Sequence, residues 1–190
     1  MLFKSTLLAI AVTALATFSA AKQIEVLPDR AATIYHGGPC ESTCEKSVAC
    51  PQCNYGDMDV VSIIRQLRVY SSALLNFNIP GKVRGCYLAI PPHTKDSFVA
   101  SDTTLTVYTA ETSDWNEVEV TGRNAPKIGR EVASQVIGDG NQVIDISSAC
   151  GCVKCPTQDV SIYIDINQPY YARFNGTKTD LGIKLLVDKE

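Results

Sequence analysis

Short segments of alternating apolar and polar residues, each bounded by turn residues, constrain the fold of this chain more than any other feature. Strict alternation over residues 105–109 and 161–166 is typical of strands that bury one face. Further segments rich in Val, Ile, Leu, Tyr and Thr end at Gly, Pro, Asn or Asp: residues 31–35, 59–64, 67–79, 83–90, 143–146, 160–166 and 181–187. Little of the chain has a helical period, so the sequence predicts an all-β sandwich or barrel.

The alternation also predicts which side chains point away from the core. We expect Thr106, Ser161, Tyr163 and Asp165 to form an outward row that faces water or a ligand. Tyr163 and Asp165 would then border a shallow groove, although polar residues that alternate along a sheet usually form only a solvated face.

The N-terminus has the features of a secretory signal. Lys4 precedes the apolar run of residues 7–12, and small residues follow as far as Ala21. The run is shorter than the roughly 20 apolar residues that a membrane span needs. We therefore expect a signal peptide over residues 1–21, a single domain over residues 22–190, and release to the extracellular space or cell wall without membrane insertion.

Acidic residues outnumber basic ones in this chain. Twenty Asp and Glu residues stand against 17 Lys and Arg, which argues against bulk nucleic-acid binding. Arg123, Lys127 and Arg130 gather in a segment that we expect to be irregular, as an anion-binding patch or a solvated loop. Arg65 and Arg68 have opposite parity, so one regular strand face cannot carry both.

Eight cysteines follow the leader, and an even number in an oxidising compartment predicts disulfide bonds. They are Cys40, Cys44, Cys50, Cys53, Cys86, Cys150, Cys152 and Cys155. We expect four bridges that staple the loops, with cysteine-rich insertions at about residues 40–53 and 150–155. The two-residue spacings at 50–53 and 152–155 also fit a zinc ribbon or a thiol oxidoreductase, which secretion and the wide separation of the pairs disfavour. Spacing leaves the pairing open.

An N-glycosylation sequon occurs at Asn175-Gly176-Thr177, in a stretch whose composition indicates a loop. A glycan on Asn175 and an unmodified Asn-Gly turn are equally good explanations of this tripeptide.

The centre of the chain carries a longer pattern. Residues 72–79 and 83–90 form a double-leucine strand and an apolar strand, and residues 143–147 and 180–187 supply two later strands. Between them lies a spaced motif: Trp115, Glu117, Val120, Thr121, Asn124, Pro126 and Gly129. Together these segments resemble the DNRLRE-type domains, which are also classed as carbohydrate-binding module family 96. Gly122 stands where that family usually has a second tryptophan, and the cysteine-bearing insertions depart from its pattern.

The resemblance implies a jelly-roll-like antiparallel β-sandwich, here with disulfide-stapled loops. Such domains commonly belong to secreted or cell-surface proteins, and some members bind polysaccharide. Because a fold does not fix a function, polysaccharide binding is a hypothesis to be weighed against the residues.

Sugar binding needs aromatic faces and groups that hydrogen-bond to hydroxyls. The candidate ligand-binding residues are Tyr170, Tyr171, Tyr163, Asp165, Trp115 and Arg123. Tyr170 and Tyr171 follow a proline in an expected loop, where they either offer a platform or cap one end of the sandwich. For Trp115 the stronger expectation is that it packs a bend against the sandwich, with Glu117 bonded to the local backbone.

Oxygen ligands for a metal are present, but the sequence defines no cage. Asp57, Asp59, Asp102 and Asp145 are candidate ligands for a structural calcium, and no EF-hand loop occurs. No other cofactor is expected.

Recognisable catalytic motifs are missing from the sequence. His36 and His93 lie in no pattern with known mechanics. Carboxylate pairs such as Glu117 with Glu119 allow a glycosidase, and a Tyr–His pair allows a polysaccharide lyase. We expect instead a secreted, non-catalytic protein that binds cell-wall or matrix polysaccharide. The alternative is a structural, adhesive or inhibitory protein with a protein partner.

Overall fold

Two antiparallel β-sheets make up the part of the chain that the computed structural model describes. That part comprises residues 23–37, 53–54, 56, 60–66, 69–91, 97–99, 103–137, 142–150, 157–167, 171–175 and 182–189. Besides the strands it contains the short 3-10 helix η2 (Ser147–Ala149).

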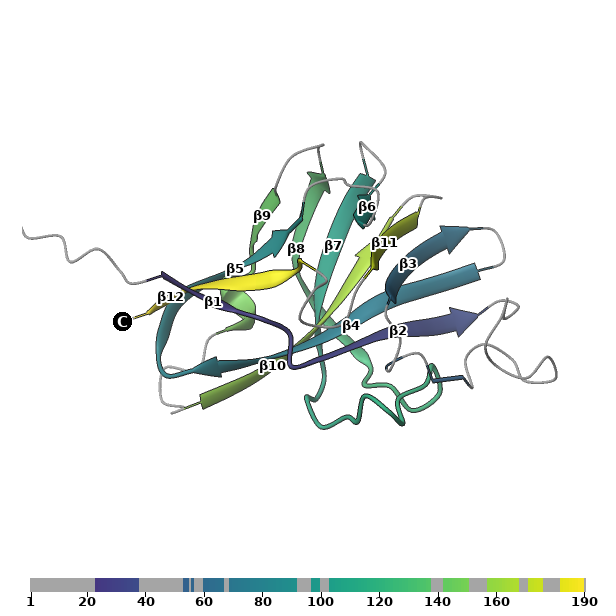
Figure 1. Cartoon of the computed structure of the whole chain (residues 1–190), viewed down its shortest axis with the longest axis horizontal. Helices are drawn as coiled ribbons and strands as arrows, with labels where there is room; N and C mark the ends of the chain where they lie inside the picture. The colour runs from purple at the N-terminus through teal and green to yellow at the C-terminus, as the bar shows by residue number, and fades with distance from the viewer. Residues whose placement is uncertain are drawn as a thin grey trace, which may run out of the picture.

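The smaller sheet has the strand order β1-β12-β5-β9, with every neighbouring pair antiparallel (Figure 1). Its strands are β1 (Gln23–Val26), β12 (Lys184–Lys189), β5 (Val83–Ile90) and β9 (Gln142–Asp145). The sheet thus joins the first described strand to the last one.

The larger sheet has the order β6-β11-β3-β4-β10-β7-β8, and β2 pairs with β4 outside this path. Its strands are β6 (Ser97–Val99), β11 (Tyr171–Asn175), β3 (Val60–Gln66), β4 (Val69–Pro80), β10 (Thr157–Ile166), β7 (Thr103–Ala110), β8 (Ile128–Ile137) and β2 (Arg30–Gly37). The long strand β4 pairs with β2, β3 and β10, so it organises the sheet.

Each strand-like segment of the sequence contributes a strand, and β5 has the predicted bounds. Four strands were not expected: β1, β6, β8 and β11. Strand β8 is mostly polar and pairs with β7 alone among the described strands, so it lacks the apolar alternation of a buried strand. Residues 123–130 were expected to be irregular, but Arg130 lies on β8.

The core lies between the two sheets. Strand β5 contributes Cys86, Leu88 and Ile90, all at most 1% exposed, and β12 contributes Leu185 and Val187. From the larger sheet the main contributions are Leu75, Phe77 and Ile79 of β4 and Ile162, Ile164 and Ile166 of β10. The predicted all-β antiparallel sandwich is therefore confirmed, while the jelly-roll connection pattern stays a prediction.

The expected outward row is buried, which corrects the sequence prediction. Thr106, Ser161, Tyr163 and Asp165 do share the face of the larger sheet opposite the core, but their exposed fractions are 6%, 4%, 0% and 5%. Residues 111–127 fold back over this face and form a second apolar cluster there, in which Trp115 and Val120 pack with Tyr163. A local alternation pattern cannot reveal such a covering segment.

A disulfide bond joins Cys86 of β5 to Cys150, directly after η2, with 6.3 Å between the Cα atoms. Cys53 is also disulfide-bonded. The remaining cysteines, Cys40, Cys44, Cys50, Cys152 and Cys155, lie outside the described residues. The prediction of stapled loops is thus confirmed at the Cys86–Cys150 bridge.

The expected signal peptide, residues 1–21, also lies outside the described residues. Within the described ranges, no helix has both the length and the apolar character to cross a membrane.

Candidate functional site

The face of the larger sheet opposite the core has a covered part and an open part. Residues 111–127 cover strands β2, β4 and β10, where the second apolar cluster lies. The open part lies beside β3 and β7, where polar side chains surround a small cavity. Side chains of the covering segment fill the covered part, whereas the open part leaves space for a ligand.

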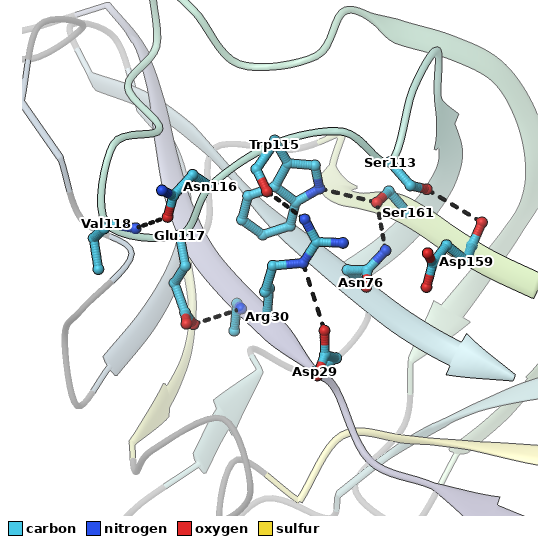
Figure 2. A network of polar contacts seen from close by, with 11 residues as sticks. Asp29, Arg30, Asn76, Ser113, Trp115, Asn116, Glu117, Val118, Asp159 and Ser161 are labelled. Atoms are coloured by element: carbon cyan, nitrogen blue, oxygen red, sulfur yellow. Dashed lines mark hydrogen bonds and ion pairs between the residues drawn. The ribbon is translucent and has the colours of Figure 1, made fainter.

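Trp115 anchors the covering segment (Figure 2). Its indole Nε1 donates a hydrogen bond of 2.9 Å to Ser161 Oγ, which also accepts one of 3.0 Å from Asn76 Nδ2. The guanidinium of Arg30 lies over the indole ring at 4.9 Å and donates to the Trp115 carbonyl. Because Trp115 is 8% exposed, its ring offers no open face on which a sugar can stack.

Glu117 fixes the same segment to β2. Its Oε1 accepts a 2.9 Å hydrogen bond from the backbone N–H of Ala31, which lies on a strand distant in sequence, whereas a bond to the local backbone was expected. The Asn54 amide donates 2.9 Å to the Glu117 carbonyl. A Cβ on Gly56 would lie 1.8 Å from that carbonyl oxygen, so this close approach requires glycine. The Trp-x-Glu motif is therefore a clamp between loop and sheet.

Tyr163 completes the covered part. Its hydroxyl donates a 2.5 Å hydrogen bond to the carbonyl of Pro126, and burial raises the pKa of this hydroxyl. With no exposed surface, Tyr163 cannot border the groove that the sequence predicted.

A hollow of about 330 Å³ lies on the covering segment itself. It is lined by Asp114, Trp115, Asn116, Glu119, Val120 and Asn124. The Asn124 side chain is occupied within the loop, because it accepts from the Thr121 amide and donates to the Glu119 carbonyl. Because Trp115 is buried and the Asn124 amide is engaged, the charged groups that this hollow offers are the exposed carboxylates of Asp114 and Glu119.

The open part holds a cavity of about 110 Å³ in which several strands meet. Its lining residues are Arg65, Thr106, Tyr108, Asp165, Ile166 and Asn167. Strand β3 supplies the arginine, β7 supplies the threonine and the tyrosine, β10 supplies Asp165 and Ile166, and Asn167 directly follows β10.

Asp165 is the buried centre of this pocket. Its Oδ2 accepts a 2.6 Å hydrogen bond from the Tyr70 hydroxyl and forms an ion pair with the Arg65 guanidinium at 3.2 Å. Its Oδ1 accepts 2.7 Å from the Ile166 amide. An ionised carboxylate has about four acceptor positions, so these three contacts hold it rigidly and leave capacity for one more donor.

Tyr70 is held from two directions. The Arg65 guanidinium lies 4.5 Å from its ring centroid, and the His36 ring stacks on it at 4.6 Å with an interplanar angle of 30°. Burial and then the hydrogen bond to Asp165 raise the pKa of the Tyr70 hydroxyl. This hydroxyl therefore stays protonated at neutral pH and donates to the carboxylate.

His36 supports the pocket from behind. Its Nε2 lies 2.7 Å from Ser72 Oγ. Burial is the main effect on His36 and lowers its pKa. The charge of Asp165 raises the pKa, and the charge of Arg65 lowers it. The imidazole is therefore neutral at physiological pH.

Tyr108 is the partly exposed aromatic residue of the pocket. Its pKa is raised by burial, then by the charges of Glu131 and Asp165. Next to it, Thr106 Oγ1 lies 3.3 Å from Ser134 Oγ. The pocket thus combines an aromatic ring with a carboxylate, a guanidinium and hydroxyls.

The other predicted site residues lie apart from this pocket or outside the described residues. Tyr171 was expected in a loop but begins β11, where it pairs with Ile64; its side chain and Tyr170 lie outside the described residues. Arg123 is exposed on the covering segment. Asn175 ends β11, and its side chain is likewise not described.

The structure tests the proposed calcium ligands in part. The described residues contain no group of three or more His, Cys, Asp or Glu side chains that could hold a metal ion. Asp145 is exposed and accepts a 2.8 Å hydrogen bond from the Ser147 amide. Asp57, Asp59 and Asp102 lie outside the described residues.

Comparison with known proteins identifies the family. A model of carbohydrate-binding module family 96 matches residues 45–180. The chain belongs to this family. The pocket-lining residues Arg65, Tyr108 and Asp165 fall within the matched range, as does Tyr70, whereas His36 precedes it.

The chain is also similar to an uncharacterized secreted protein of Arthroderma benhamiae. The two are 27% identical over 138 residues, which are 70% of this chain and 68% of the relative. Family membership thus makes this protein a carbohydrate-binding module, and a distant relative is named as secreted.

Of the pocket-lining residues, the sequence pointed to Asp165 as a ligand-binding residue but missed Tyr108, and it also missed Tyr70, which holds Asp165. Both tyrosines lie on strands that were predicted, yet their approach to Asp165 depends on how β3, β4, β7 and β10 pair. The parity of Tyr108 with Thr106 was the available signal, because side chains two positions apart share a strand face.

Proposed function

We propose that this protein is a secreted, non-catalytic module that binds polysaccharide in the pocket lined by Arg65, Thr106, Tyr108 and Asp165. The observation that carries the proposal is the buried Asp165 carboxylate, fixed by Tyr70 and Arg65 at the base of an open pocket. Preorganised polar groups of this kind bind ligand without a further cost of ordering.

The chemistry of a sugar fits these groups. A pyranose hydroxyl both donates and accepts, so it can donate to Asp165 while accepting from the Arg65 guanidinium, whose side chain is 47% exposed. The ring of Tyr108 offers an apolar surface for the C–H face of a sugar. The cavity of about 110 Å³ suits one protruding part of a chain, with the rest of the polysaccharide outside.

A non-catalytic role agrees with the protonation of the two best candidates for acid–base chemistry. The raised pKa of Tyr70 makes this hydroxyl a poor base at neutral pH. The neutral His36 is engaged with Ser72 and stacked on Tyr70, behind the pocket. Residues 1–21 would act as the secretion signal and residues 22–190 as the single binding domain.

The test is retention of the oxidised mature protein on insoluble polysaccharides: cellulose, chitin, mannan, β-1,3-glucan and polygalacturonate. We expect saturable binding to one of them, and an affinity at least about tenfold weaker for Tyr108→Ala and Asp165→Asn, since a tenfold change needs about 1.4 kcal/mol. Val136→Ala, at an exposed position on β8 outside the pocket, is the matched control and should bind as the wild type does.

Thermal melts of each variant separate loss of binding from loss of fold. Wild-type affinity in folded Tyr108→Ala and Asp165→Asn would show that the pocket is not the binding site. Silence on all five polysaccharides, with capture of a defined protein ligand, would replace the proposal with the protein-partner alternative.

A further inference from the structure

The smaller sheet presents an outward face that the proposed pocket does not use. Its inward residues on β5, Cys86, Leu88 and Ile90, fill the core, so alternation sends Gly85, Tyr87 and Ala89 to the other side. Figure 1 shows the four strands of this sheet, β1, β12, β5 and β9, grouped together as one layer of the sandwich. Among the described segments, the 3-10 helix η2 lies against the edge of this face, where Ser147 Oγ accepts a 3.1 Å hydrogen bond from the Cys86 amide and would lie 3.1 Å from a Cβ on Gly85.

Strand register arranges the outward side chains in rows across the sheet. Tyr87 pairs with Leu186 of β12 on one side and with Asp145 of β9 on the other, and Leu186 pairs with Glu25 of β1. A neighbouring row joins Gly85 of β5, Asp188 of β12 and Gln23 of β1. Polar groups therefore flank an aromatic ring in a regular pattern.

The ring of Tyr87 lies along the strand over Gly85. A Cβ built on Gly85 would be 3.1 Å from the Tyr87 hydroxyl and 3.5 Å from its Cε2. Because Gly85 has no side chain, the ring can lean along the sheet instead of standing away from it. An aromatic ring on the outward face of a sheet is the type of side chain on which a sugar can stack.

A groove of about 450 Å³ lies next to the Tyr87 row, on the side of Ala89; Leu186 and Glu25 of that row line it, whereas Tyr87 itself does not. Its lining comes from all four strands and the segments that flank them: Gln23, Glu25, Ala89, Ile90, Pro91, Gln142, Val143, Gly182, Lys184 and Leu186. Three strand spacings give a length of roughly 14 Å, enough for a short run of sugar units. The volume lies in the usual range of ligand sites.

The polar side chains of this face are partly ordered already. Lys184 Nζ lies 2.6 Å from Glu25 Oε1, and Gln23 Nε2 donates 3.1 Å to Asp188 Oδ1. The pKa of the Tyr87 hydroxyl is raised chiefly by the charge of Asp188, with burial and Asp145 adding to it. Carboxylates therefore surround the hydroxyl end of the ring.

The charge of the face selects the class of ligand. Lys184 pairs with Glu25, so that the carboxylates of Asp145 and Asp188 remain on the neighbouring positions of the outward rows. An anionic polysaccharide would be repelled, whereas the hydroxyls of a neutral one can donate to these carboxylates.

We propose that the outward face of the smaller sheet is a second glycan-binding surface, on which a neutral polysaccharide stacks on Tyr87 and lies across β1, β12, β5 and β9. The inference rests on the proposed function, because it assumes that polysaccharide is the ligand. It goes beyond family membership, since β1 and β12 lie outside the matched residues 45–180.

The test is two-dimensional amide NMR of the oxidised mature protein, titrated separately with cellohexaose, laminarihexaose, chitohexaose and mannohexaose. The wild type is compared with Tyr87→Ala, Tyr87→Phe and the pocket variant Tyr108→Ala. We expect one hexasaccharide to shift the amides of Gly85, Tyr87 and Leu186. Binding at these amides should weaken about tenfold in Tyr87→Ala and less than about threefold in Tyr87→Phe, which keeps the ring.

Each result separates the second surface from the first. Shifts at Gly85 and Tyr87 that persist in Tyr108→Ala support the second surface, whether or not the pocket amides of Asp165 and Asn167 also move. Shifts confined to the pocket amides overturn the second surface and leave the proposed function standing. No shift with any of the four sugars overturns it as well; retention on polygalacturonate that is lost in Tyr108→Ala would then leave the proposed function standing, with an anionic ligand.

Discussion

His36 lies where the candidate pocket meets the buried part of the larger sheet. Its imidazole contacts Ser72 at 2.7 Å and stacks on Tyr70, which in turn holds Asp165. A change in the charge of this one ring therefore reaches the carboxylate through a single intervening residue. The pocket should depend on the imidazole remaining neutral.

Because burial lowers the pKa of His36 from its ordinary value of 6.5, folding should become less favourable in mild acid. Above that value the ring is neutral in both states and contributes no pH dependence. As the pH falls below it, the unfolded chain takes up the proton first, and stability is lost until the pH passes the lowered value. Urea unfolding at pH 7.5 and pH 5.5 measures the loss.

The matched variant is His36→Gln, which keeps a hydrogen-bonding group for Ser72 but cannot be protonated. We expect the free energy of unfolding of the wild type to fall more between pH 7.5 and pH 5.5 than that of this variant. Parallel losses in the two proteins would mean that other groups account for the acid sensitivity.

At the scale of elements, the Trp-x-Glu clamp holds the covering segment, residues 111–127, against the larger sheet. Trp115→Phe removes the indole N–H that donates to Ser161 and leaves part of the ring volume empty. We expect a loss of about 1–3 kcal/mol in the free energy of unfolding. Val118→Ala, at a side chain that is 61% exposed on the same segment, should change it by less than about 0.5 kcal/mol. Equal effects in the two variants would contradict the clamp.

The Cys86–Cys150 bridge closes a loop with a sequence separation of 64 residues. In the chain-entropy model, a loop of this length gives about 4 kcal/mol of stabilisation. The double variant Cys86→Ala/Cys150→Ala should lose about 2–4 kcal/mol in urea unfolding at neutral pH. Val143→Ala, an exposed residue of the same sheet, is the control. A loss below about 1 kcal/mol would show that β5 and η2 are held together mainly by packing.

The sequence predicted the strands well because alternation is a local pattern. It predicted the sites less well because their residues come together from distant parts of the chain. The shared face of Ser161, Tyr163 and Asp165 could be inferred from parity, whereas its burial depends on a covering segment more than 30 residues earlier in the chain. The polar edge strand β8 carried too little apolar signal. The surroundings of Tyr87 depend on its register with β9 and β12, which the residues of β5 do not encode.

At the scale of the whole molecule, the pocket and the Tyr87 surface lie on opposite sides of the shared core. Asp165 belongs to the face of the larger sheet that points away from the core, and Tyr87 to the corresponding face of the smaller sheet. One stretch of polysaccharide cannot lie on both faces of the sandwich without passing around it. A protein that binds at both should therefore bridge two chains, or two distant parts of one chain.

Binding at both surfaces predicts that the protein cross-links polysaccharide chains. With the soluble form of the retained polysaccharide, turbidity should rise to a maximum at an intermediate ratio of protein to glycan and fall when protein is in excess, because excess protein occupies each chain separately. Tyr87→Ala and Tyr108→Ala should each abolish the maximum while keeping the binding at the other surface. A turbidity maximum that survives in Tyr87→Ala would mean that self-association of the protein, and not a second surface, links the chains.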